Sequence, residues 1–426
     1  MSDRPDGVEI RPYERLVGEW PTRFHLRIDP DGRGLLLANA AEAAYLSPVG
    51  VRMARGILEE RSEEEIISGV MQAFPGAPQS QVQADLAMVR ELIADLSKPG
   101  DNYPVSNLTD PRFSEWERQL AAPLRADVDQ CDPDVFRQMI HRLWDAGIPH
   151  VAIQTDPSGD VAQLVLLVEA AEDIGMICGL RAVAGWLGAG EASGPEIIEA
   201  CGMAGLDHLD LLYLCHDRAE HDATCGEGDY AAFVAAVKQA QALEVAVVAE
   251  VPLIASNIAD LDKMMGELQG LGVTNVVGFA IACPDEDEAA AASGALPARA
   301  LPQVATTFIE LAESTRVRYL WAPPVRFDSA RGLAEQILAG PRTAADVTIR
   351  VRADGTVLPP RGAEAAGNLL QQDWTDIWRD EAFKRYRERL KQPTRCPECP
   401  DLPICSADCP KDPAGWSDDR EGGEVR

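Results

Sequence analysis

Alternating apolar and polar positions predict a small mixed unit at the start of the chain. Phe24, Leu26 and Ile28 alternate with polar neighbours, as a half-buried strand requires, and Asp29 to Gly32 supplies turn residues before the apolar run Leu35 to Leu37. Three helices are predicted to follow, at Ser47 to Glu59, from a capping box at Ser62 and Glu65 to Phe74, and from Val82 to Lys98. Residues 1–100 should therefore form a hairpin followed by three helices.

A different pattern begins after a polar linker at residues 101–120. Short apolar runs alternate with segments whose apolar residues recur at helical spacing. The predicted strands are His150 to Gln154, Met176 to Ala184, Leu209 to Leu214, Val245 to Leu253, Asn275 to Ile281 and Arg318 to Trp321. The predicted helices are Asp134 to Ala146, Val161 to Ile174, Glu196 to Ala204, Tyr230 to Leu243, Asn257 to Leu271 and Leu301 to Ser314. This alternation predicts an α/β fold with a parallel sheet or an open barrel, whose active site would lie at the carboxyl ends of the strands.

Four of the ten cysteines lie close together near the end of the chain. Cys396, Cys399, Cys405 and Cys409 are separated by two, five and three residues in a stretch rich in proline, which prevents a regular helix. Four thiolates in one rigid loop suit tetrahedral zinc or an iron–sulfur cluster. Two disulfides are the alternative. The chain starts without a basic-then-apolar signal segment and has no long apolar run, so we expect a reduced, cytoplasmic protein and favour the metal.

The net charge excludes two classes of partner. It is -30, from 39 basic and 69 acidic residues, and such a field repels nucleic acid phosphates and anionic membrane surfaces. We therefore expect neither a nucleic acid nor a membrane as a partner, and solubility is the common reason for such a charge.

Other chemically active side chains have ordinary structural explanations. Cys215, His216, His221 and Cys225 form a possible second metal site, but Cys215 ends an apolar strand, where buried thiols are common, so we favour a structural role. Cys131 has no base in its local sequence to make it a nucleophile. Three further thiols beside apolar runs are predicted to lie in the core: Cys178, Cys201 and Cys283.

Residues 20–98 resemble the peptide-recognition element of the pyrroloquinoline quinone chaperone type. The resemblance rests on the hairpin, the segment Tyr45-Leu-Ser-Pro-Val-Gly50 and the three helices. It implies a winged-helix module in which the leader of a ribosomal precursor peptide adds a strand to a sheet edge. The implied edge comprises Gly34, Leu35, Leu36 and Leu37, and the implied groove comprises Val82, Leu86 and Val89. A winged helix that only packs on its neighbour is the alternative.

Residues 120–410 resemble radical SAM enzymes that carry a SPASM extension. The matching segments include Ala122-Pro-Leu124, Leu143-Trp-Asp-Ala-Gly147, His221-Asp222 with Gly226, Val351-Arg-Ala-Asp-Gly-Thr-Val357 and the final cysteines. The resemblance implies a partial (β/α)6 barrel of the TIM type at residues 121–335 and a cysteine-rich SPASM-type extension at residues 336–426.

The departures from that family are informative. Its catalytic cluster needs three cysteines spaced by three and then two residues, and this chain has no such triplet; after Leu124 only Cys131 is present. The Gly-Gly-Glu-Pro stretch that contacts S-adenosylmethionine is replaced by Thr155 to Gly159, so we expect no S-adenosylmethionine binding. The extension has Leu358-Pro-Pro360 where a cluster cysteine is usual, and no cysteine follows Cys409. One 4Fe-4S cluster, or a structural zinc, remains for the four final cysteines.

These observations predict a pseudoenzyme of a ribosomal-peptide modification system. It would bind the precursor's leader peptide and form a hetero-oligomer with an active radical SAM enzyme. Two alternatives stay open: an electron-transfer iron–sulfur protein, and an enzyme with non-radical chemistry at the altered barrel mouth that uses Cys131, His216 or Asp156.

Overall fold

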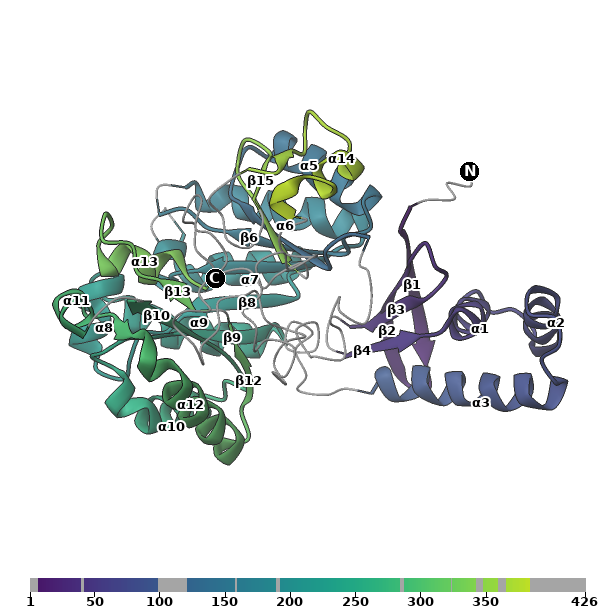
Figure 1. The fold of residues 1–426 in the computed structure, drawn as a ribbon, viewed down its shortest axis with the longest axis horizontal. Coiled ribbons are helices and arrows are strands. Elements are labelled where there is room, and N and C mark those ends of the chain that lie inside the picture. Colours follow the sequence, from purple (N-terminus) through teal and green to yellow (C-terminus); the bar gives the residue numbers. More distant parts are fainter. Residues whose placement is uncertain are drawn as a thin grey trace, which may run out of the picture. The chain divides into compact units, whose positions relative to one another are not determined.

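The computed structural model describes residues 7–39, 42–98, 121–157, 159–188, 192–283, 287–322, 324–341, 348–358 and 365–383 (Figure 1). The chain divides into two compact units. The first contains a small antiparallel sheet with three helices, and the second contains a large sheet with its helices. The predicted linker at residues 101–120 and the four final cysteines lie outside the described residues.

The first unit is built on a four-stranded antiparallel sheet in the order β1-β2-β3-β4. Its elements are β1 (Glu9–Val17), β2 (Trp20–Ile28), β3 (Gly34–Ala38), β4 (Glu42–Leu46), α1 (Pro48–Leu58), α2 (Glu63–Ala73) and α3 (Gln79–Leu96). The predicted hairpin is β2 with β3, in which Leu26 faces Leu36. The pattern did not predict β1 or β4, which extend the sheet on both sides.

Local side chains start the first two helices where the sequence predicted. The Ser47 hydroxyl accepts a hydrogen bond from the Gly50 amide at 3.1 Å. Ser62 and Glu65 form a full capping box, in which each side chain bonds the backbone amide of the other residue. Each cap satisfies amides that a helix leaves without partners, so these two boundaries follow from local chemistry.

The second unit is organised by six parallel strands that pair in sequence order. They are β5 (Arg125–Asp129), β6 (His150–Gln154), β7 (Ile177–Ala182), β8 (His208–Leu212), β9 (Ala246–Leu253) and β10 (Asn275–Cys283). Beyond β10 lie β11 (Leu296–Pro297), β12 (Arg318–Trp321) and β13 (Val325–Arg326), and beyond β5 lie β14 (Thr348–Val351), β15 (Thr356–Leu358) and β16 (Gly367–Asn368). This is the predicted α/β fold with a parallel sheet.

Helices connect the parallel strands of this unit, as parallel pairing requires. They are α5 (Pro133–Asp145), α6 (Val161–Ile174), α7 (Gly194–Met203), α8 (Arg218–Cys225), α9 (Asp229–Ala242), α10 (Leu261–Gly270), α11 (Asp287–Ser293), α12 (Leu301–Thr315) and α13 (Leu333–Ala339). One further helix, α14 (Trp374–Trp378), follows the last strand.

The two faces of the parallel sheet differ in chemistry. Side chains alternate between faces along a strand, and residues in register share a face. One face is apolar and packs on helices; at Gly278 the Phe308 ring of α12 lies so close that an added Cβ would be 2.6 Å from it. The other, which we call the polar face, carries the partly buried Asp127 and six buried charged or polar side chains: Arg125, His150, Arg181, His208, Asp210 and Glu250.

Candidate functional site

The polar face holds a chain of interactions that crosses several strands. Arg125 Nε lies 2.7 Å from Asp127 Oδ1, and its Nη2 lies 3.1 Å from Asp210 Oδ2. Asp210 Oδ1 lies 2.8 Å from His208 Nδ1, and His208 Nε2 lies 2.7 Å from His150 Nε2. These residues come from β5, β6 and β8. Because β7 contributes Gly179 between the two histidines, the rings can meet: a Cβ there would lie 1.8 Å from His208 Cε1.

Burial and pairing set the charge state of the carboxyl groups on this face. Burial alone would raise the pKa of Asp210, but the neighbouring His208 and Arg125 outweigh it and lower that pKa to about 2. Burial raises the pKa of Glu250 above its usual value, although Arg181, whose Nε lies 2.8 Å from Glu250 Oε2, opposes the shift. Asp210 is therefore an anion at neutral pH, and its partners keep it so.

The loops that follow β5 and β6 contact each other directly. Gln130 Nε2 donates to the Asp160 carbonyl at 2.8 Å, and the amide of Asp156 donates to Gln130 Oε1 at 3.4 Å. Gly159 allows this contact, because a Cβ at that position would lie 2.5 Å from Gln130 Oε1. These are the two segments in which the sequence departs from the radical SAM pattern.

The candidate nucleophile in the first of these loops is poorly suited to its role. Cys131 is half-buried, and burial together with the nearby Asp132 and Asp129 raises the pKa of its thiol to about 12. At neutral pH the thiol stays protonated, which disfavours nucleophilic attack. Among the described residues, Nδ1 of the candidate base His216 has no hydrogen-bond partner, so this nitrogen is not bonded to Cys131.

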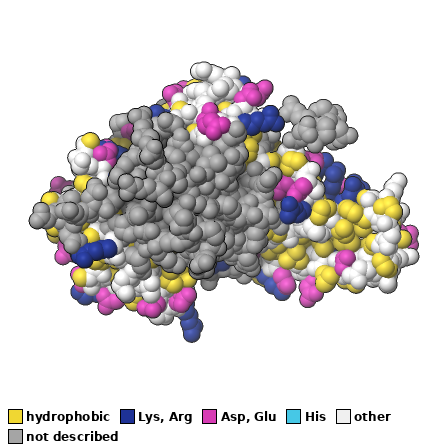
Figure 2. All heavy atoms as spheres, in the orientation of Figure 1, with side chains coloured by type: hydrophobic (Ala, Val, Ile, Leu, Met, Phe, Trp, Pro, Cys, Tyr) yellow, Lys and Arg dark blue, Asp and Glu magenta, His cyan; other side chains and the backbone are white. Residues whose placement is uncertain are grey.

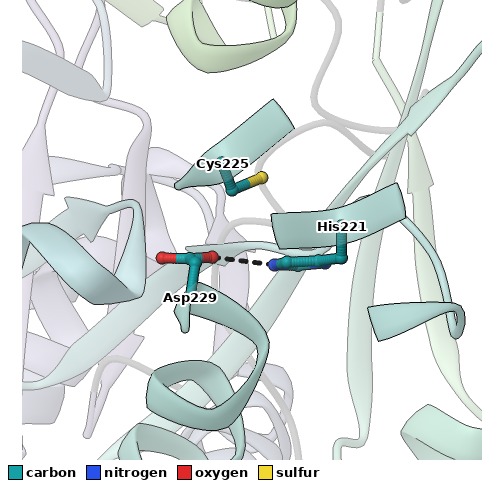
Figure 3. A group of neighbouring side chains, drawn as sticks. All are labelled: His221, Cys225 and Asp229. Carbon is teal, nitrogen blue, oxygen red and sulfur yellow. Dashed lines mark hydrogen bonds and ion pairs between the residues drawn. The ribbon is translucent and has the colours of Figure 1, made fainter. Parts of the chain in front are cut away.

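A second cluster lies where α8 meets α9 and contains His221, Cys225 and Asp229 (Figure 3). Their potential ligand atoms all lie within 4.8 Å of one another. His221 Nε2 lies 2.7 Å from Asp229 Oδ2, and His221 Nδ1 accepts a hydrogen bond from the Leu214 amide at 3.3 Å. Sequence reasoning named His221 and Cys225 but missed Asp229, which lies eight residues further on.

This arrangement supports the structural reading of the cluster. Since Nδ1 accepts from an amide, Nε2 carries the proton and donates to Asp229, so His221 has no lone pair left for a metal ion. Burial and Asp229 raise the pKa of the Cys225 thiol, which keeps it protonated. The same segment holds α9 in place, because Asp222 Oδ1 accepts from the Tyr230 amide at 2.8 Å. The predicted core thiols, Cys178, Cys201 and Cys283, are indeed buried.

The predicted peptide-binding edge in the first unit needs correction. Strand β3, which contains Gly34, Leu35, Leu36 and Leu37, pairs with β2 on one side and with β4 on the other. It therefore has no open backbone edge, and all of its residues are buried. The outer strands of this sheet are β1 and β4, and β4 is half-exposed over most of its length.

Two of the three predicted groove residues, Val82 and Leu86, lie in the core between the helices of the first unit. Val82 and Leu86 of α3 are only 2% and 1% exposed and pack in a cluster with Met53, Ile66 and Val70. The helical spacing that suggested a groove is the spacing of a packing face. Val89 is partly buried at the border of this cluster. Figure 2 shows apolar side chains gathered over this unit, where Met71 and Met88 are exposed.

Two comparisons relate the chain to known proteins. Residues 344–401 match the family model of the SPASM domain, described as an iron-sulfur cluster-binding domain. That range includes Cys396 and Cys399 and ends before Cys405 and Cys409. No curated protein sequence matches the chain. None of the described helices combines the length and apolar character needed to cross a bilayer.

The fold is similar to that of SuiB from Streptococcus suis. The crystal structure of SuiB bound to S-adenosylmethionine aligns with a TM-score of 0.54 and 12% identity, over 97% of this chain and 99% of that chain. SuiB bound to its precursor peptide SuiA aligns with a TM-score of 0.54 and 10% identity, over 94% and 95%. The chain therefore shares the overall fold of SuiB and contains a stretch that matches an iron–sulfur cluster-binding domain of the SPASM family.

Proposed function

We propose that the chain is a non-catalytic radical SAM-like protein of a ribosomal-peptide modification system. Its first unit binds the leader of a precursor peptide, and its second unit supports an active radical SAM partner. The observation that carries this proposal is the altered loop after β5, where one protonated thiol stands in place of three cysteines.

Radical SAM chemistry needs an iron–sulfur cluster with one iron open to S-adenosylmethionine. Cys131 alone cannot hold such a cluster, because iron–sulfur clusters are bound by several thiolates. The hydrogen bonds of Gln130 also join the loops after β5 and β6, between which the cluster and its ligand would be held. These loops support a structural role for the second unit.

For the first unit, the corrected sheet order moves the proposed peptide site to β4. An outer strand can accept a further strand through its backbone, and side chains beside it select the sequence. Ala44 of β4 packs against the same cluster as Val89 and Leu92 of α3, so a peptide added to β4 would lie near that helix. The SuiB structure with its precursor peptide makes a peptide ligand a reasonable class for this fold.

The proposed metal centre consists of Cys396, Cys399, Cys405 and Cys409. The family match favours an iron–sulfur cluster, and an all-sulfur donor set fits it. A bound cluster would supply one-electron transfer, whereas zinc would only hold the loop together. Iron, sulfide and zinc per chain, measured after purification without oxygen, separate these outcomes.

The experiment that tests the whole proposal uses a radical SAM enzyme encoded beside this chain. Gel filtration of the two proteins together should give a complex, and peptide modification should need both. The isolated chain, reconstituted with iron and sulfide, should not cleave S-adenosylmethionine. Cleavage at a rate that Cys131→Ala abolishes would overturn the proposal in favour of an enzyme; persistent separate elution would remove the supporting role.

A further inference from the structure

A short helix, α13, lies beside α8 at the end of the second unit where the carboxyl ends of the parallel strands lie (Figure 1). It is bounded by Gly332 at its amino end and Gly340 at its carboxyl end, where φ is 77°. Ile337 is buried, and Gln336 accepts from the Asp328 amide at 2.9 Å. Glycines at both ends are suited to a hinged segment, because they tolerate large changes in backbone angles.

Arg181 fastens this helix to the polar face. Its Nε lies 2.8 Å from Glu250 Oε2, and its Nη1 donates to the Leu338 carbonyl at 2.8 Å. The side chain is only 6% exposed. Its Nη2 is buried without a hydrogen-bond partner among the described residues and packs on Gly340, where an added Cβ would lie 2.2 Å from it.

The guanidinium is therefore incompletely satisfied on the side that faces α13. One nitrogen donates to a neutral carbonyl, and the neighbouring nitrogen has no acceptor in the part of the chain that the structure describes. A carboxylate would accept from both in the bidentate geometry that guanidinium groups favour, and charged acceptors bind more strongly than neutral ones. Arg181 is also near the end of β7, on the edge where ligands bind in folds of this type.

We propose that α13 is a lid latched by Arg181, and that a ligand carboxylate opens it by replacing the Leu338 carbonyl and filling the empty position at Nη2. Glu250 keeps the guanidinium oriented in both states. This inference does not depend on the proposed peptide-modification role, because it concerns only contacts within the second unit.

Hydrogen–deuterium exchange of the full chain tests the latch. Gly340→Ala should open the lid while leaving the Arg181–Glu250 pair in place, and we expect amides 336–340 to exchange at least tenfold faster, with β6 to β9 unchanged. Arg181→Met combined with Glu250→Gln removes the latch without leaving a buried charge, and should have the same local effect. Arg331→Met is the matched control, since Arg331 precedes α13 and the substitution removes only its exposed pair with Glu335 of that helix. Unchanged exchange in Gly340→Ala would refute the latch.

Citrate, compared with sodium chloride at equal ionic strength, tests the ligand class. In the wild-type chain citrate should accelerate exchange of amides 336–340, and in the Arg181→Met/Glu250→Gln variant it should not. A wild-type response to both salts, or to neither, would overturn the carboxylate assignment. Loss of protection throughout β6 to β9 in Gly340→Ala would show that α13 is a fixed part of the core rather than a lid.

Discussion

The two sheets of this protein differ in the extent of their buried charge networks and in their outer strands. In the second unit, several charged side chains of the polar face pair with one another within the sheet, as in the chain from Asp127 through Arg125 and Asp210 to His208. In the first unit, the sheet has a buried centre at β3 and ends in two outer strands. A sheet with a buried network between its strands is suited to support, whereas outer strands are suited to partners, and three measurements test that contrast.

The largest effect is expected on the polar face. Asp210→Asn removes the charge that pairs with Arg125 and His208, so the free energy of unfolding should fall by roughly 3–5 kcal/mol, as expected when one partner of a buried ion pair is lost. Urea denaturation measures this. The control is Asp129→Asn, whose partner Arg350 is 46% exposed; we expect a loss of less than about 1 kcal/mol. Equal losses of stability in the two variants would contradict a larger contribution from the buried network of the polar face.

The pH dependence of the free energy of unfolding should also reflect ionisation of Asp210. The pKa of Asp210 is lowered to about 2 in the folded chain, so its ionised form stabilises the fold above its unfolded pKa and this contribution is lost as the pH falls toward 2. The loss should be about 2 kcal/mol between roughly pH 5 and pH 2. Unfolding measured across that range should be less pH-dependent in Asp210→Asn than in the wild type, and parallel curves would contradict the assignment.

The smallest effect is expected at β4. Proline at Ala43 or Ala44 removes the backbone N–H of that residue. Adjacent N–H groups point to opposite edges of a strand, so in one variant the lost N–H is the one that faces away from β3 and leaves the β3–β4 pairing intact. That variant should keep its melting temperature and bind a fluorescent leader peptide about tenfold more weakly, as expected for loss of one or two hydrogen bonds in strand addition. Glu14→Pro in the opposite outer strand, β1, is the control. Equal weakening by both would contradict a site at β4.

The sequence predicted the elements better than their pairing. Helix α6 and strands β6 and β12 have the predicted bounds, because apolar periodicity and caps are local signals. Strand β1 was missed because Pro12 and several charged residues interrupt its pattern, and β4 because it is short and has two alanines. Without those strands, β3 was taken for an edge.

The candidate sites show the same limit. Arg125, Arg181, Asp210 and Glu250 were not predicted to form a network, because polar residues in strands usually face solvent and their partners lie on other strands. The contact between Gln130 and the loop after β6 likewise depends on the register of two strands. By contrast, a structural role for His221 was expected from the family resemblance of His221-Asp222, although its partner Asp229 was not predicted.

The close approach of His208 to Gly179 has a consequence for any attempt to redesign this sheet. The histidine ring occupies the space that a side chain at position 179 would need, so the residue at position 208 limits which residues fit at position 179. A library that varies position 179 alone should therefore return only glycine, whereas one that also allows a smaller residue at position 208 can place a side chain on β7. Any side chain added at position 179 thus requires a compensating change on the neighbouring strand.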